Sequence, residues 1–104
     1  MDMDTLLAFI KKEHHRLNAH YYGGPNQKAR YTQLAKLMEE LGELSEAILQ
    51  QEKHQRKFKL KQKRDLAGEF ADVILCTLIL AQEMGVEIKP ALKKKISKIE
   101  RRVY

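Results

Sequence analysis

The sequence contains few of the residues that break helices or that stabilise extracellular proteins. Its 104 residues include one cysteine, five glycines, two prolines and no tryptophan. Because Cys76 is the only cysteine, the chain has no internal disulfide and gives no sign of an oxidising compartment. The longest apolar run is far shorter than the roughly 20 residues that span a bilayer, and the start at residues 1–4 is acidic where a secretory signal is basic. We therefore expect a cytoplasmic protein without a membrane partner, with residues 1–104 forming a single domain.

Positive charge is in excess and is concentrated in two stretches. Twenty lysines and arginines stand against fourteen acidic residues, which gives a formal net charge of +6. Seven of the basic residues lie in 53–64, which has no acid, and seven more lie in 89–102, where Glu100 is the only acid. Such stretches are typical of solvated surface. They are also typical of a surface that binds a polyanion, either nucleotide phosphates or a nucleic-acid backbone.

The pattern of apolar residues predicts four helices, at about 4–20, 27–53, 63–84 and 90–102. A Gly-Gly-Pro run at 23–25 separates the first two, because glycine and proline break helices. In the second helix, apolar residues recur with the 3.6-residue period of an amphipathic helix. This stripe consists of Leu34, Leu37, Met38, Leu41, Leu44, Ser45 and Ile48. The predicted fold class is therefore all-α.

The third predicted helix contains an apolar segment, residues 73–81, with hydrophobic side chains on almost every side. Periodicity alone would also allow a buried strand there. The alanine, leucine and glutamate residues before the segment and its lack of turn residues favour a buried helix. In that helix we expect Cys76 to be a small buried hydrophobe and not a nucleophile. Gly85 is expected to end the helix, and Pro90 suits the first turn of the last one.

Two pairs of carboxylates occur at the same helical spacing. Glu40 and Glu43 form the first pair, and Glu69 and Asp72 form the second. Residues three positions apart lie on one helix face, and like charges there destabilise an isolated helix by roughly 0.2–0.5 kcal/mol per pair. No lysine or arginine lies between the members of either pair, so we expect a compensating cation. Oxygen ligands without cysteine or histidine nearby favour Mg²⁺, with Mn²⁺ as the alternative, over zinc.

The helical positions of these acids indicate that they are partly buried. Glu40 borders the apolar stripe of the second helix, whereas Glu43 lies further round and needs a second packing surface to be buried. Glu69 and Asp72 lie on a stripe that leads directly into the apolar segment of the third helix. Buried carboxylates without partners are unfavourable and usually bind a cation or become neutral. Gly42, which costs about 1 kcal/mol relative to alanine within a helix, suggests that another group approaches closely.

Residues 36–48, Lys-Leu-Met-Glu-Glu-Leu-Gly-Glu-Leu-Ser-Glu-Ala-Ile, closely resemble the first motif of the MazG-like all-α nucleotide pyrophosphohydrolases. Residues 69–75, Glu-Phe-Ala-Asp-Val-Ile-Leu, resemble the second motif, and residues 85–102 look like the closing helix of that family. The resemblance covers about residues 30–102, which is the motif-bearing part of the domain. It implies a four-helix bundle-like MazG-type fold, assembled as a homodimer or as a dimer of dimers (a homotetramer) with sites near the interface.

The resemblance implies an enzyme that hydrolyses an NTP or dNTP to the monophosphate and pyrophosphate, with Mg²⁺ as cofactor. The carboxylates that would hold the metal are Glu40, Glu43, Glu69 and Asp72. Glu39 resembles an additional acid of the family's longer motif and would orient or deprotonate the attacking water. The basic residues that would bind the substrate's phosphates are Lys95, Lys98, Arg101 and Arg102. One departure is Ile99, where the family often has an asparagine that contacts the nucleotide, so recognition of base and sugar is left open.

Two other functions are left open. Phosphoribosyl-ATP pyrophosphohydrolases belong to the same superfamily, but their second motif usually continues into Tyr-His, where this chain has Leu75-Cys76. A non-catalytic basic helical protein that binds nucleic acid would explain the net charge, but it would leave the four carboxylates without a purpose. Nucleic acid is therefore not the expected partner. The histidines of Glu13-His14-His15 do not have the spacing of a known metal motif.

Overall fold

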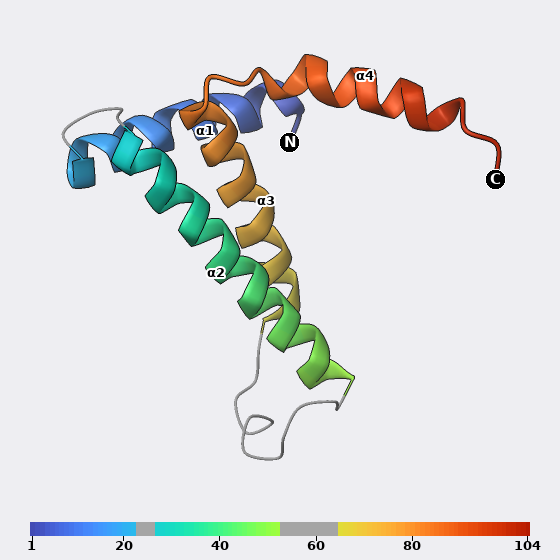
Figure 1. Cartoon of the computed structure of the whole chain (residues 1–104), viewed down its shortest axis with the longest axis horizontal. Helices are drawn as coiled ribbons and strands as arrows, with labels where there is room; N and C mark the ends of the chain where they lie inside the picture. The colour runs from blue at the N-terminus through green and yellow to red at the C-terminus, as the bar shows by residue number, and fades with distance from the viewer. Residues whose placement is uncertain (23–26, 53–64) are drawn as a thin grey trace.

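The computed structural model describes residues 1–22, 27–52 and 65–104 (Figure 1). The regular structure of these residues is entirely helical, so the predicted all-α fold is confirmed. The elements are α1 (Met3–Leu17), its π-helical continuation η1 (Asn18–Tyr22), α2 (Gln27–Gln51), α3 (Leu66–Glu83) and α4 (Ile88–Glu100). The basic stretch 53–64 and the turn predicted at 23–25 lie outside the described residues. In the described ranges, no helix combines the length and the apolar character that crossing a bilayer requires.

Aspartate side chains begin two of the helices. Asp2 accepts a hydrogen bond from the backbone N–H of Thr5 at 2.8 Å and so caps the N-terminus of α1. Asp65 accepts one from the backbone N–H of Gly68 at 3.1 Å and caps α3 in the same way. Each cap satisfies a first-turn donor that has no partner within the helix. The cap on α3 fixes the residue at which that helix begins, so that Glu69 lies in its first turn.

The turn between α3 and α4 follows the predicted glycine. Gly85 has a φ of 71°, in the left-handed region that favours glycine, and it ends α3 as expected. α4 begins at Ile88, two residues before the predicted Pro90. Proline is tolerated at the third helical position because the N–H groups of the first turn have no acceptor within the helix.

α2 and α3 run antiparallel and form the most extensive helix pair of the molecule, while α1 and η1 pack across the end where α3 finishes and α2 begins (Figure 1). A small apolar core lies where α1 meets α3. Its buried members are Ile10, Leu78 and Ile79, and the partly buried side chains around them are Leu6, Leu17, Leu75 and Ile88.

α4 leaves this core and projects away from the other helices (Figure 1). Its first turn is fixed, because Ile88 packs against the core and the Lys89 Nζ atom lies 2.8 Å from Asp4 Oδ1 on α1. Beyond that turn, its apolar side chains are between 37% and 52% exposed: Leu92, Ile96 and Ile99. α4 therefore does not close a bundle with the other three helices of its own chain.

Apolar side chains also face solvent on the α2–α3 pair. The segment 73–81 is helical as predicted, but it is not buried on every side, since Ile74 is 54% exposed while Leu78 and Ile79 are buried. α2 carries an exposed apolar stripe beside the face that packs on α3. This stripe consists of Tyr31, Leu34, Met38, Leu41 and Ile48. A single chain thus leaves a large apolar surface uncovered, which is typical of a protein interface.

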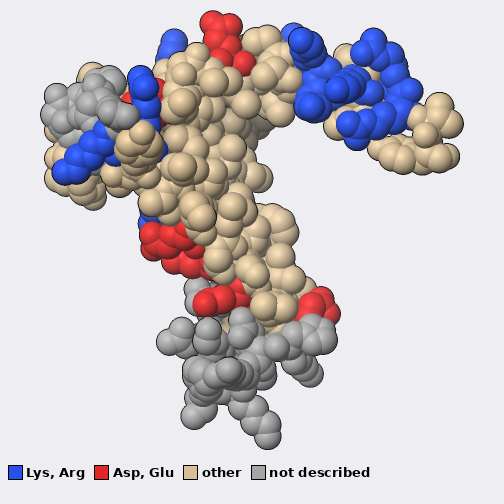
Figure 2. All heavy atoms as spheres, viewed as in Figure 1, with Lys and Arg blue, Asp and Glu red and all other residues tan. Residues whose placement is uncertain are grey.

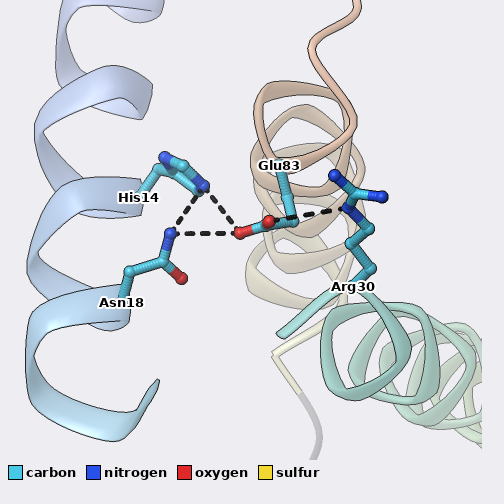
Figure 3. A network of polar contacts seen from close by, with 4 residues as sticks. All are labelled: His14, Asn18, Arg30 and Glu83. Carbon is cyan, nitrogen blue, oxygen red and sulfur yellow. Dashed lines mark hydrogen bonds and ion pairs between the residues drawn. The ribbon is translucent and has the colours of Figure 1, made fainter. Parts of the chain in front are cut away.

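A buried glutamate at the end of α3 links all the packed helices. The Glu83 side chain is fully buried, and its Oε1 accepts hydrogen bonds from His14 Nε2 at 2.8 Å and from Asn18 Nδ2 at 3.1 Å. On the other side, Arg30 Nε of α2 lies 4.0 Å from Glu83 Oε2. Figure 3 shows the three side chains converging on the carboxylate from α1, η1 and α2. The network fixes the position of α1 and η1 against the hairpin of α2 and α3.

We expect His14→Ala to lower the free energy of unfolding by about 2 kcal/mol, because it removes a donor from a fully buried carboxylate. The exposed neighbour provides the control: His15→Ala should change the same quantity by less than about 0.5 kcal/mol. Urea denaturation of both variants at one protein concentration measures the difference. Equal losses in the two variants would show that the network does not stabilise the position of α1.

Candidate metal centre

The α2–α3 pair brings together three of the four carboxylates that the sequence suggests as metal ligands. Glu40 and Glu43 lie about one turn apart on α2, and Glu69 lies in the first turn of the antiparallel helix α3. Each offers a carboxylate oxygen, and these three oxygens lie within 4.8 Å of one another. Oxygens bound to one Mg²⁺ at about 2.1 Å are at most about 4.2 Å apart. Small side-chain rotations would therefore place all three on one ion.

Glu40 is the most deeply buried member of the group, with 6% of its surface exposed. Its Oε1 accepts a hydrogen bond from Lys36 Nζ at 3.0 Å. Its Oε2 is also buried, and within the part of the chain that the structure describes this atom has no hydrogen-bond partner. A buried carboxylate oxygen without a partner is unfavourable, and a divalent cation would satisfy it. The donor set therefore fits a hard cation such as Mg²⁺.

The charge of Glu40 shifts the pKa of three titratable side chains near it. It raises the pKa of the Glu43 carboxyl, with further contributions from desolvation and from the charge of Glu69. The hydrogen bond to Glu40 raises the pKa of the Lys36 ammonium group. Burial raises the pKa of the half-buried Cys76 thiol, and the charge of Glu40 adds to this effect. The thiol accordingly stays neutral beside the acids, which agrees with its expected behaviour as a small hydrophobe.

Two further acids predicted for the site lie outside this group. Asp72 is exposed on α3, although its negative charge contributes to the raised pKa of Cys76 one turn further along. The Glu39 side chain is 60% exposed, and its Oε1 lies 3.9 Å from Lys36 Nζ. Both side chains are exposed. The structure thus leaves these two candidate residues outside the group of three.

The basic residues predicted to bind phosphate are exposed on α4 and just beyond it: Lys95, Lys98, Arg101 and Arg102. Figure 2 shows that the lysines and arginines of α4 gather at one end of the molecule, whereas acidic side chains gather over α2. Because α4 projects away from the α2–α3 pair (Figure 1), one chain does not bring these basic residues to its own carboxylates.

The roles of Lys36 and Glu83 were not predicted from the sequence, and the surroundings of Gly42 differ from those expected. Lys36 contacts Glu40, and the four-residue spacing typical of helical ion pairs was the available signal. Glu83 lies seven residues after Cys76, on the same side of α3. A single acid in a helix does not by itself indicate a buried hydrogen-bond network. A Cβ atom at Gly42 would meet no atom within 4 Å among the described residues, so the close approach expected there does not occur within one chain.

Comparison with known proteins identifies a family. The sequence model of the MazG nucleotide pyrophosphohydrolase domain matches residues 28–103. This range contains both carboxylate pairs, Lys36 and the whole of α4. No curated protein and no solved structure matches the chain significantly. The family resemblance seen in motifs 36–48 and 69–75 is therefore confirmed.

We expect Glu43→Gln to raise the melting temperature of the metal-free protein at pH 8 but not at pH 4. The pKa of Glu43 is higher in the folded protein than its ordinary value of 4.5, so the ionised side chain opposes folding. This penalty is absent below the ordinary pKa and develops as the pH rises through the pKa of the folded state. Thermal unfolding in EDTA at the two pH values measures the effect, with the exposed Glu52→Gln as the control. An equal gain at both pH values would contradict an electrostatic cause.

Proposed function

Because the chain belongs to the MazG nucleotide pyrophosphohydrolase family, we propose that it is a Mg²⁺-dependent enzyme that hydrolyses an NTP or dNTP to the monophosphate and pyrophosphate. Family membership supports nucleotide pyrophosphohydrolase activity in general. The observation that carries the finer proposal is the group formed by Glu40, Glu43 and Glu69, in which the buried Glu40 Oε2 has no hydrogen-bond partner among the described residues. Such a group suits Mg²⁺, which binds few carboxylates and keeps its other positions for water and phosphate oxygens. Mn²⁺ has the same ligand preferences and is the alternative cofactor.

The reaction requires water to attack phosphorus at the α–β anhydride bond, which breaks as pyrophosphate leaves. A divalent cation held by the carboxylates would neutralise phosphate charge and lower the pKa of a bound water. Glu40, Glu43 and Glu69 would hold it, with Asp72 as the fourth carboxylate, at the solvent side of the group. Glu39 would accept the proton of the attacking water, because its carboxylate lies next to the group and is open to solvent.

All of residues 1–104 would act as one functional domain, although the family match begins at residue 28. α1 shares its core with α3 and donates to the buried Glu83, which lies on the helix that also carries Glu69. Loss of α1 would therefore disturb the helix that supplies part of the site.

The proposed metal site predicts that Glu40→Gln and Asp72→Asn each lower pyrophosphate release by more than about 100-fold. Both changes remove a negative charge from an acidic group, so the helical content and the melting temperature should stay the same or rise. Glu52→Gln, on an exposed residue at the end of α2, should keep wild-type activity. The assay measures pyrophosphate released with Mg²⁺ from a panel of NTPs and dNTPs, together with phosphoribosyl-ATP.

The turnover of Asp72→Asn tests the ligand set, and the turnover of Glu40→Gln tests the metal site as a whole. Near-normal turnover of Asp72→Asn would remove this exposed residue from the ligand set and leave the group of three. Near-normal turnover of Glu40→Gln would overturn the metal assignment itself. Hydrolysis restricted to phosphoribosyl-ATP would replace the proposed substrate class.

We further propose that a second copy of the chain completes the site, in a homodimer or a homotetramer. The apolar stripe of α2 and the exposed side chains of α3 and α4 need a partner surface, and a second copy has a matching one. The space beside Gly42 leaves room for another chain to approach α2 closely. Lys95 and Lys98 of one copy would then reach phosphates bound at the carboxylates of the other.

Mixed oligomers test this arrangement directly. Lys95→Ala/Lys98→Ala should raise KM or lower kcat without weakening Mg²⁺ binding, and Glu40→Gln should be inactive. If the two kinds of residue act across the interface, mixing the impaired lysine variant with the inactive Glu40→Gln protein restores one complete site per mixed dimer. The expected recovery is about a quarter of wild-type activity for a two-fold dimer that exchanges freely.

Absence of recovery, once mass spectrometry has shown that mixed oligomers form, would place both sets of residues in a single chain. Sedimentation that detects only the 12.2 kDa monomer at micromolar concentration would overturn the oligomer itself. If the double variant hydrolysed nucleotides normally but lost salt-resistant, sequence-selective binding to nucleic acid, α4 would serve nucleic acid and not the substrate.

A further inference from the structure

Lys36 is the cation that the structure places directly on the most buried carboxylate of the candidate site. Its Nζ lies 3.0 Å from Glu40 Oε1 and 3.9 Å from Glu39 Oε1. The lysine stands one helical turn before Glu40, and its side chain is 49% exposed, whereas that of Glu40 is 8% exposed. The ion pair therefore joins a half-exposed side chain to one that is buried.

The surroundings of Glu40 explain why a cation is needed there. Glu43 and Glu69 present carboxylate oxygens within 4.8 Å of an oxygen of Glu40, so three negative charges lie close together. A buried carboxylate among other acids is unfavourable unless a positive charge compensates it. Lys36 supplies that charge to Glu40 Oε1, while Oε2 is left without a hydrogen-bond partner among the described residues.

We propose that Lys36 is an exchangeable counter-ion, which neutralises Glu40 in the metal-free protein and yields this carboxylate to the divalent cation. The inference rests on the proposed function in one respect, namely that the carboxylates hold a metal ion. It goes beyond that function because it assigns a role to a residue outside the ligand set. It also explains how a chain with three clustered acids folds before any metal binds.

The geometry favours exchange over a permanent pair. Water screens the half-exposed lysine, and a doubly charged ion that also engages Glu43 and Glu69 attracts the buried carboxylate more strongly than one ammonium group does. A flexible, solvated lysine can leave without disturbing the packing of α2 on α3. Once released, its ammonium group remains one turn from the ligand that it left, on the solvent side where the phosphates of a nucleotide would lie. Lys36 is then available as a phosphate contact.

The direction in which the Mn²⁺ affinity changes when Lys36 is replaced tests the proposal. Mn²⁺ titration followed by calorimetry should show about two- to fivefold tighter binding to Lys36→Met than to the wild type, because the competing cation is gone. Lys28→Met carries the same charge change at an exposed position near the start of α2, and its affinity should equal that of the wild type. Lys36→Arg keeps the competitor and should also bind as the wild type does.

Weaker Mn²⁺ binding by Lys36→Met would overturn the proposal, since it would make Lys36 a residue that positions Glu40 for the metal. Unchanged binding would overturn it as well. A wild-type protein that binds no Mn²⁺ would instead contradict the proposed function, so the two failures are distinguishable.

Two further measurements separate exchange from a general charge effect. In EDTA, the melting temperature of Lys36→Met should fall below that of Lys28→Met, because Lys36 pairs with one of the clustered acids. With saturating Mn²⁺ this difference should disappear. The KM for the nucleotide should rise for Lys36→Met although the metal binds more tightly. A KM that falls together with the Mn²⁺ dissociation constant would exclude the phosphate contact.

Discussion

The antiparallel packing of α2 on α3 is the constraint on which the rest of the structure depends. The side of α2 that faces α3 repeats every seven residues, with Gln33, Glu40 and Ala47 buried along it. Glu40 thus occupies a position where an apolar side chain would pack best. The opposite direction of α3 brings its first turn, with Glu69, to the middle of α2. The same contact that forms the hairpin therefore creates the acidic cluster.

The protein contains two deeply buried glutamates, and it compensates them in different ways. Glu83 Oε1 accepts hydrogen bonds from His14 and Asn18, both buried or nearly so, and Arg30 of a third element lies 4.0 Å from Oε2, which makes the network part of the packed core. Glu40 receives one ammonium group, from a half-exposed side chain of its own helix. Removing a partner from Glu83 disturbs how three helices meet. The partner of Glu40 lies on the same helix, so we expect its loss to leave the packing of the helices unchanged and the site able to exchange one cation for another.

Local signals allowed much of the fold to be predicted from the sequence. The helices, the glycine that ends α3 and the two pairs of acids follow from spacing along single helices, whereas the grouping of Glu69 with Glu40 and Glu43 was expected from the need for a shared cation and from the family resemblance. Interactions between distant segments could not be predicted in this way: the pairing of His14 with Glu83 joins residues 69 positions apart, and neither lies in a motif. The direction of α4 was also inaccessible, because an amphipathic helix packs equally well on its own chain or on another. The exposure of Asp72 could not be predicted either, since the packing of α3 on α2 decides whether Glu69 or Asp72 faces the other helix.

The distance between acidic and basic side chains within one chain has a physical consequence. If α4 packed along α2 of its own chain, its lysines and arginines would pair directly with Glu40 and its neighbours, and ion pairs would take the place of a binding site. In the structure α4 projects away (Figure 1), and among the described residues Lys36, a cation of the same helix, pairs with Glu40. In the proposed assembly, basic residues of a second copy approach the acids only with phosphates between them. Charges then alternate from carboxylate to metal to phosphate to ammonium, so that each layer is attracted by both of its neighbours. Such an order is favourable only while a polyanion is bound, which ties the completion of the site to the presence of the nucleotide.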